Sequence, residues 1–145
     1  MQTPSDASHT TMEAQRSDRV KMMAELADLR QQEESVKAQR LIDEFVHQAM
    51  KSGPAPVRLS AIIGGRVVKT NLRGWYLRRD HTIAIGSDGG YYRLGLPGRP
   101  SLMDLLKGVR LEPSAPPLVV GRGGKDGESG DLDVFLARAL SGGVG

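Results

Sequence analysis

Apolar side chains between residues 17 and 52 recur at the spacing of a helix. Met22, Leu26, Leu29 and Val36 follow one another at intervals of four, three and seven residues, which is the narrow seam of a coiled coil. A broader apolar stripe follows, typical of a helix that lies on a core, and consists of Ala38, Leu41, Ile42, Phe45, Val46, Ala49 and Met50. We therefore predict an amphipathic helix over 17–52, with different partners for its two halves.

Two alternatives stay open for this helix. The polar run "RQQEES" at 30–35 either lies inside one long helix that changes its partner or separates two helices, and we favour the first. The helix begins either at the capping-box pattern Thr10–Glu13 or at Ser17-Asp18, and it ends at Gly53-Pro54. Residues 1–16 precede the favoured start, and we expect them to form a disordered tail.

Residues 57–96 carry the signals of an antiparallel meander. Short β-branched and aromatic runs are separated by Gly and Asp, and they cover 57–63, 66–72, 74–79, 82–86 and 91–96. Asp88-Gly89 suits a tight hairpin turn with positive φ at the glycine. We expect three to five strands, one face of which packs on the helix around Phe45.

Two short helices are predicted after the meander. One covers 101–108 with Ser101 as its cap, and "VRLEP" after it resembles one more strand. The other covers 131–140 and places Leu132, Phe135 and Leu136 on one face. The predicted class is α+β, with a long N-terminal helix, a small antiparallel β-meander and a short C-terminal helix. The small domain covers 57–140, and 141–145 form a second disordered tail.

Composition excludes some kinds of site and of partner but leaves the predicted fold unchanged. The chain has 145 residues and no cysteine, which excludes disulfides, thiolate metal sites and cysteine nucleophiles and fits a cytoplasmic protein. No apolar stretch approaches the roughly 20 residues of a membrane helix, so we expect no membrane partner.

The segment "VVGRGGKDGESG" at 119–130 resembles a phosphate-binding loop. The P-loop motif requires Ser or Thr after its Gly-Lys pair and a glycine five residues before the lysine's glycine, but Asp126 and Val119 stand there. A weaker anion site would use the backbone and the basic side chains of Arg122, Gly123, Gly124 and Lys125. We favour a mobile connector before a capped helix.

Basic residues are interleaved with aromatic ones on the predicted strands, as on surfaces that bind single-stranded nucleic acid. The candidates are Arg66, Lys69, Arg73, Arg78, Arg79, Arg93 and Tyr92. The competing interpretation is that Trp75 belongs to the core and that the arginines protect a sheet edge. A net charge of only +3 limits the electrostatic attraction for nucleic acid.

No constellation in the sequence indicates catalysis. Asp80, His81 and Ser87 could be combined into a triad, but all three are ordinary turn residues at those positions. The acids at 126–133 lack the third ligand and the glycine of a calcium loop. We predict no catalytic residue, no metal and no cofactor.

The runs "GWYLRRDHTIAIGSDGGYYRL" and "PPLVVGRGGKDGESGDLDVFLARAL" resemble a group of small actinobacterial proteins that have no assigned activity. The resemblance covers about residues 72–140. It implies an actinobacterial source and supplies no functional residues.

These patterns favour a non-enzymatic interaction or adaptor protein. Its N-terminal helix would bind itself or another helical protein through Met22, Leu26, Leu29 and Val36. The alternative is a nucleic-acid-binding protein that uses the Arg/aromatic sheet face, and the third hypothesis is an anion or nucleotide site at 121–130.

Overall fold

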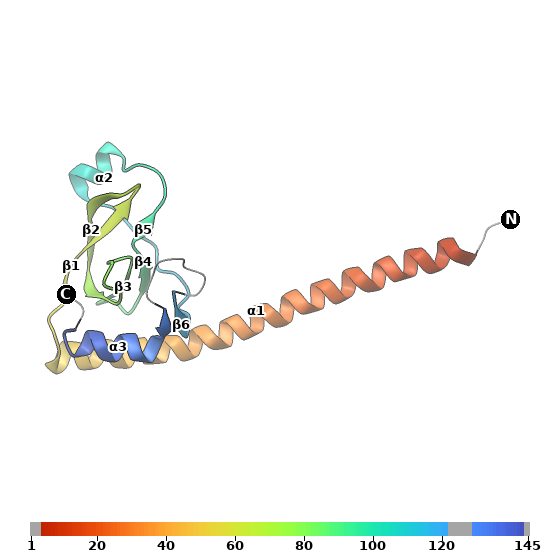
Figure 1. Cartoon of the computed structure of the whole chain (residues 1–145), viewed down its shortest axis with the longest axis horizontal. Coiled ribbons are helices and arrows are strands. Elements are labelled where there is room, and N and C mark those ends of the chain that lie inside the picture. The colour runs from red at the N-terminus through yellow and green to blue at the C-terminus, as the bar shows by residue number, and fades with distance from the viewer. Residues whose placement is uncertain (1–3, 122–128, 144–145) are drawn as a thin grey trace. The chain divides into compact units, whose positions relative to one another are not determined.

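The computed structural model describes residues 4–121 and 129–143, with side chains from Thr11 onward. It confirms an α+β fold with a long N-terminal helix and a short C-terminal one (Figure 1). The chain divides into two compact units, residues 1–34 and residues 35–145. The boundary lies within the first helix.

Helix α1 covers Pro4–Ser52 and is continuous through the polar run 30–35. It begins well before the predicted start at residue 17, because the residues after Pro4 contain no Gly or Pro until Gly53 and a proline is tolerated in the first helical turn. Residues 1–3 and 144–145 of the two predicted tails lie outside the described residues. The helix ends as predicted, and the Gly53 amide donates to the carbonyl of Ala49 at 3.0 Å.

A five-stranded sheet forms the centre of the second unit. Its strands are β1 (Val57–Ile63), β2 (Arg66–Tyr76), β3 (Ile83–Gly86), β4 (Tyr91–Arg93) and β5 (Gly95–Leu96), in the order β4-β3-β2-β1-β5. The first four strands form the predicted antiparallel meander, but β5 pairs with β1 in parallel. The sheet is therefore mixed.

The predicted break between strands 66–72 and 74–79 was wrong, because β2 continues through it to Tyr76. A Cβ at Gly74 would lie 1.9 Å from the carbonyl oxygen of Ile85. The glycine is required because β2 and β3 approach closely there, and it does not mark a turn.

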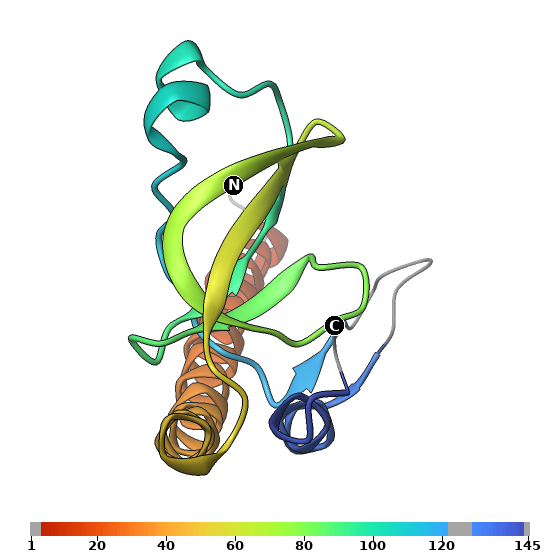
Figure 2. The same cartoon turned by 90° about the vertical axis from the view of Figure 1, so that its left-hand side faces the viewer.

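The predicted strand 91–96 is divided at Leu94, and this division curls the sheet. The Leu94 amide donates to Thr82 on the β3 side, and its carbonyl accepts from Ile62 of β1, each at 2.7 Å. One continuous stretch of chain thus pairs with β3 through β4 and with β1 through β5. Figures 1 and 2 show the resulting strong curvature of β1 and β2.

The two faces of the curled sheet bury separate sets of side chains. The inner face encloses residues such as Leu59, Leu94 and Tyr92. The outer face packs on helices α1 and α3 (Leu132–Leu140), which lie next to each other on one side of the sheet (Figure 2). Phe45 of α1 meets Trp75 of β2 edge to face, with ring centroids 5.3 Å apart. This confirms the predicted docking of the helix around Phe45.

Two further elements complete the second unit. Helix α2 (Leu102–Lys107) begins at the predicted cap Ser101, and the predicted strand after it is reduced to an isolated bridge between Val109 and Thr70. A short ladder pairs β6 (Val119–Val120) with β7 (Gly130–Asp131). Among the described residues, no helix is long and apolar enough to cross a membrane.

Candidate interaction surfaces

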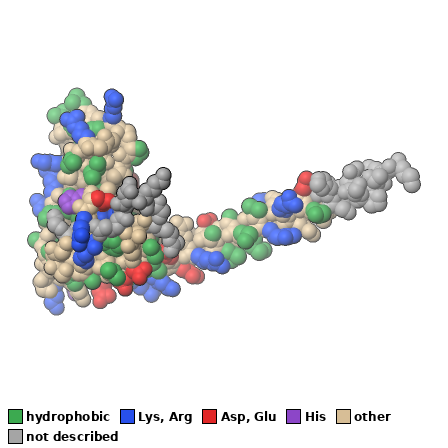
Figure 3. Space-filling view, viewed as in Figure 1, with side chains coloured by type: hydrophobic (Ala, Val, Ile, Leu, Met, Phe, Trp, Pro, Cys, Tyr) green, Lys and Arg blue, Asp and Glu red, His purple; other side chains and the backbone are tan. Residues whose placement is uncertain are grey.

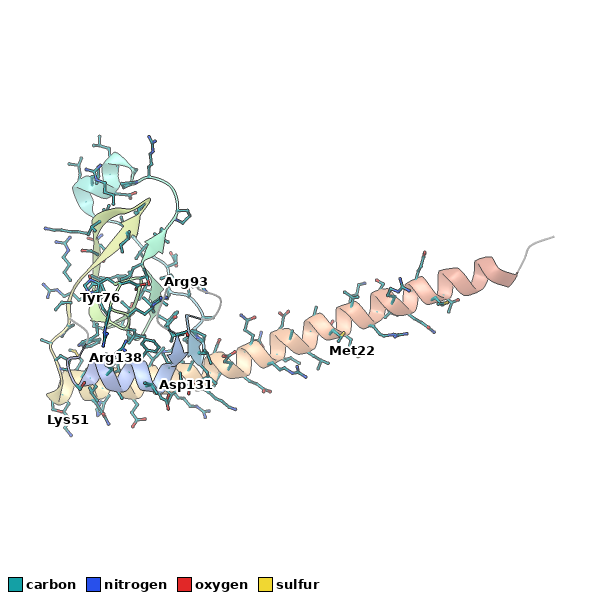
Figure 4. All side chains as sticks on the ribbon, in the orientation of Figure 1. Met22, Lys51, Tyr76, Arg93, Asp131 and Arg138 are labelled. Atoms are coloured by element: carbon teal, nitrogen blue, oxygen red, sulfur yellow. The ribbon has the colours of Figure 1, made fainter. Side chains whose placement is uncertain are left out.

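All four residues of the predicted helical seam are exposed in the structure. Met22, Leu26, Leu29 and Val36 have exposed fractions of 63%, 47%, 55% and 53%. Every side chain from residue 11 to residue 33 is exposed, and Met22 projects from this part of the helix in Figure 4. Helices in proteins are stabilised mainly by packing of an apolar face, and the described residues provide none for this stretch.

The first helix exposes more large apolar side chains than the sequence pattern singled out. Met12, Val20 and Met23 are also exposed. Met12 continues the seam by the heptad repeat, with Gln15 and Arg19 at the intervening positions. The seam surface consists of the a and d positions of this repeat, which are Met12, Gln15, Arg19, Met22, Leu26, Leu29, Glu33 and Val36.

The basic residues proposed for nucleic-acid binding do not share one face. Lys69 and Arg73 alternate onto the outer face of β2, and Arg73 lies opposite Arg58 of β1. Arg66 has the opposite parity in β2, and Arg93 lies on the edge strand β4. Strand pairing therefore distributes the positive charge over several parts of the sheet.

Three of the aromatic side chains on the strands lie in the core. Tyr92 is 3% exposed, and Trp75 and Tyr91 are buried as well. The Tyr92 hydroxyl donates to Asp88 Oδ2 at 2.6 Å, and burial together with this bond raises the pKa of Tyr92 to about 12. The assignment of Tyr92 to a nucleic-acid surface was therefore wrong, because the curled sheet encloses its ring.

Arg78 is also buried, at 8% exposed, and forms an ion pair with Asp80 at 3.2 Å. Partial burial by itself would raise the pKa of Asp80, but hydrogen bonds from Thr82 and the charge of Arg78 outweigh burial and lower that pKa. The Asp80 carboxylate binds Thr82 through its amide and its hydroxyl. The buried Arg78 side chain thus holds the turn at Asp80 in place. It is not exposed as a basic side chain that contacts nucleic acid would have to be.

Asp80 and His81, two members of the imagined triad, have other partners in the structure. The ring of His81 stacks on Tyr76 with centroids 3.8 Å apart, while the Asp80 carboxylate is engaged by Thr82 and Arg78. His81 has a φ of 60°, a left-handed conformation that suits a tight turn. The arrangement is that of a turn held by its own side chains.

The candidate anion site falls outside the described residues. Arg122, Gly123, Gly124 and Lys125 all lie in the segment 122–128. Within 4–121 and 129–143, no group of three or more His, Cys, Asp or Glu side chains is arranged to hold a metal ion.

Sequence reasoning missed one exposed apolar surface, on α2. Its apolar residues were assigned to a short helix, but none of them is buried. The available signal was the density of large apolar residues in "LMDLLK", four in six positions.

No protein-family model, curated protein or solved structure matches the chain. The resemblance to the actinobacterial group stays a resemblance.

Proposed function

We propose that this protein is a non-enzymatic interaction protein that self-associates through the seam surface of α1. The supporting observation is the exposure of its large apolar side chains, above all Met22, Leu26 and Leu29. Apolar residues at a and d positions stabilise a helix by packing against a second helix. The proposed compartment is the cytoplasm, where a chain without cysteine needs no oxidative folding.

Charges within the seam surface favour an antiparallel pair of identical chains. In a parallel pair, Arg19 would face Arg19 and Glu33 would face Glu33 across the seam. In an antiparallel pair, Leu26 of one copy would lie opposite Leu29 of the other. Heptad geometry then places Arg19 of one copy one layer away from Glu33 of the second copy. Both ends of the apolar centre then gain an attractive contact.

A parallel pair has one compensating feature. Glu25 and Arg30 would meet across its flank at g and e positions. Exposed ion pairs of this kind contribute at most about 1 kcal/mol, whereas like charges inside a seam are repelled in a partly desolvated setting. The antiparallel arrangement is therefore the one we propose.

Light scattering of the full chain tests self-association. We expect an assembly larger than one chain that Leu26→Asp reduces to the monomer, because a carboxylate would be placed at the centre of the seam. Val134→Asp, a change of the same chemistry at an exposed position of α3, is the matched control and should leave the mass unchanged. A monomeric parent chain would refute the proposal.

Engineered cysteines determine the orientation, since the natural chain has none. An antiparallel pair predicts that Leu26→Cys and Leu29→Cys chains cross-link with each other when mixed, and that neither cross-links efficiently with itself. A parallel pair predicts efficient cross-linking of Leu26→Cys alone.

A charge exchange checks the same contact without cross-linking. Arg19→Glu or Glu33→Arg alone should weaken an antiparallel assembly, and the double exchange should restore it. In a parallel assembly, the double exchange would still place like charges opposite each other.

The nucleic-acid alternative lacks a comparable supporting observation. Trp75, Tyr91 and Tyr92 are buried, the ring of Tyr76 is stacked on His81, and the basic residues are divided between faces, so these aromatic residues do not form a stacking platform with charges around it.

A further inference from the structure

Helix α2 exposes its apolar side, the reverse of an ordinary surface helix. Leu102 and Leu106 are each 72% exposed, Met103 is 55% exposed and Leu105 is 44% exposed. At about 100° per residue, these four side chains fill one continuous arc about 160° wide, and Asp104 lies opposite them. The apolar side therefore serves no core within the described chain.

Several contacts hold α2 in this orientation. Ser101 and Asp104 form a complete capping box, with bonds of 2.9 and 3.1 Å. After the helix, the amide of Val109 donates to the Lys69 carbonyl of β2 at 2.9 Å, and the Val109 side chain is buried.

The loop before α2 is fixed as well. A Cβ at Gly64, in the β1–β2 turn, would lie 2.1 Å from the carbonyl oxygen of Gly98, so the two loops are packed tightly. The chain is thus fixed on both sides of the exposed helix. Helix α2 lies at the end of the sheet opposite the end that meets α1 and α3 (Figure 1).

Basic residues flank this helix in the sequence and also occur at the neighbouring end of β2, on both of its faces. Segments 66–69 and 99–110 hold five basic residues against one carboxylate, Asp104, a net charge of +4 in a chain whose total is +3. All five basic side chains are exposed; they are Arg66, Lys69, Arg99, Lys107 and Arg110. Hydrophobic and basic side chains lie together over α2 in Figure 3. The single carboxylate is engaged in the capping box.

We propose that α2 and its basic surroundings bind the surface of an anionic lipid membrane. Leu102, Met103 and Leu106 would enter the boundary between headgroups and acyl chains, which interfacial helices reach at a depth of about 5–10 Å. The basic side chains would meet the negative lipid headgroups, whose potential attracts clustered Lys and Arg. The apolar side chains of α2 therefore suit the acyl chains of such a membrane, and the neighbouring basic side chains suit its headgroups.

This contact differs from the one that sequence reasoning set aside. The expectation of no membrane partner was based on the absence of a spanning segment, and surface binding needs only a short apolar face with basic neighbours. The proposed membrane contact uses none of the residues of the seam surface. Membrane binding and self-association can therefore be refuted independently of each other.

Flotation of the full chain with lipid vesicles tests the proposal. We expect binding to mixed phosphatidylcholine–phosphatidylserine vesicles to exceed binding to pure phosphatidylcholine vesicles at least about tenfold, and to weaken as salt screens the charges. Leu102→Ser with Leu106→Ser should reduce binding at least about tenfold, because the apolar insertion is lost. Arg99→Gln with Lys107→Gln should remove most of the preference for anionic lipid.

Val134→Ser, at an apolar position of α3 that is 61% exposed, is the matched control and should bind like the parent. The melting temperature of each variant should equal that of the parent, since every changed side chain is exposed.

Three results would overturn the proposal. One is a parent chain that does not float with anionic vesicles, and another is unchanged binding by the Leu102/Leu106 variant. The third is an assembly that this variant dissociates in the absence of lipid, which would assign α2 to a contact between proteins.

Discussion

Single residues show how burial decides between core and surface roles. Trp75, Tyr91 and Tyr92 were candidates for both, because alternation along a strand does not state which face is covered. In the structure, α1 and α3 cover one face of the sheet and its own curvature encloses the other. Aromatic residues of both parities are therefore buried.

Phe45 provides a direct measure of the docking of α1 on the sheet. It is 4% exposed and contacts Trp75, so we expect Phe45→Ala to lower the free energy of unfolding by about 3–5 kcal/mol. Urea denaturation measures this loss. Met50→Ala is the control on the same helix, because Met50 is 58% exposed, and it should cost less than about 0.5 kcal/mol. A loss below about 1 kcal/mol at Phe45 would contradict the docking.

Tyr92 should make the fold sensitive to alkaline pH. Its pKa is raised to about 12 from about 10 in an unfolded chain, so between these values the folded state binds the proton more tightly. Stability is then fully present below about pH 10 and declines as the pH rises toward 12, by on the order of 1 kcal/mol at pH 11. Tyr92→Phe should remove this part of the decline.

Urea denaturation of the parent and of Tyr92→Phe at about pH 8, 10 and 11 makes the comparison. An equal decline in both chains would show that Tyr92 does not titrate with folding.

Among the secondary-structure elements, the β strands depend on contacts that the sequence pattern does not display. The division at Leu94 follows from pairing with two different strands, and the length of β2 follows from the close approach of β3 at Gly74. Both predicted boundaries depended on local signals, which do not include partners distant in the sequence.

Gly74→Ala tests the close approach of β2 and β3. A Cβ would lie 1.9 Å from the Ile85 carbonyl oxygen, so the strands must separate, and we expect a loss of about 1–3 kcal/mol or more. Gly95→Ala is the matched control, because the nearest atom to its Cβ lies 3.6 Å away. Similar melting temperatures for the two variants would contradict this account of Gly74.

For the molecule as a whole, the two compact units should separate by truncation. Residues 35–145 contain all of the buried hydrophobic residues that the structure describes, including Ala38, Ile42 and Phe45. A chain of residues 35–145 should therefore unfold cooperatively with a melting temperature within a few degrees of the full chain, about the effect of 1 kcal/mol. It should also be monomeric in light scattering, since the centre of the seam surface is removed.

A separate peptide of residues 1–34 should show weak helicity at low concentration, because an isolated helix of this kind lacks tertiary packing. Its helicity should rise with concentration as copies pair. Strong helicity that does not depend on concentration would indicate that the seam needs no partner.

Local chemistry in the sequence was sufficient for the presence of helices α1, α2 and α3, for the turn at Asp88-Gly89 and for the fold class, but not for the start of the first helix or the length of β2. Helical periodicity, the Ser101 cap and the Asp88-Gly89 turn are properties of neighbouring residues, and Gly89 has the predicted positive φ of 86°. The exposed seam was recognisable for the same reason. Tertiary structure alone decided the parallel pairing of β5, the burial of Tyr92 and Arg78, and the outward face of α2, because each depends on which distant segment covers a given side chain.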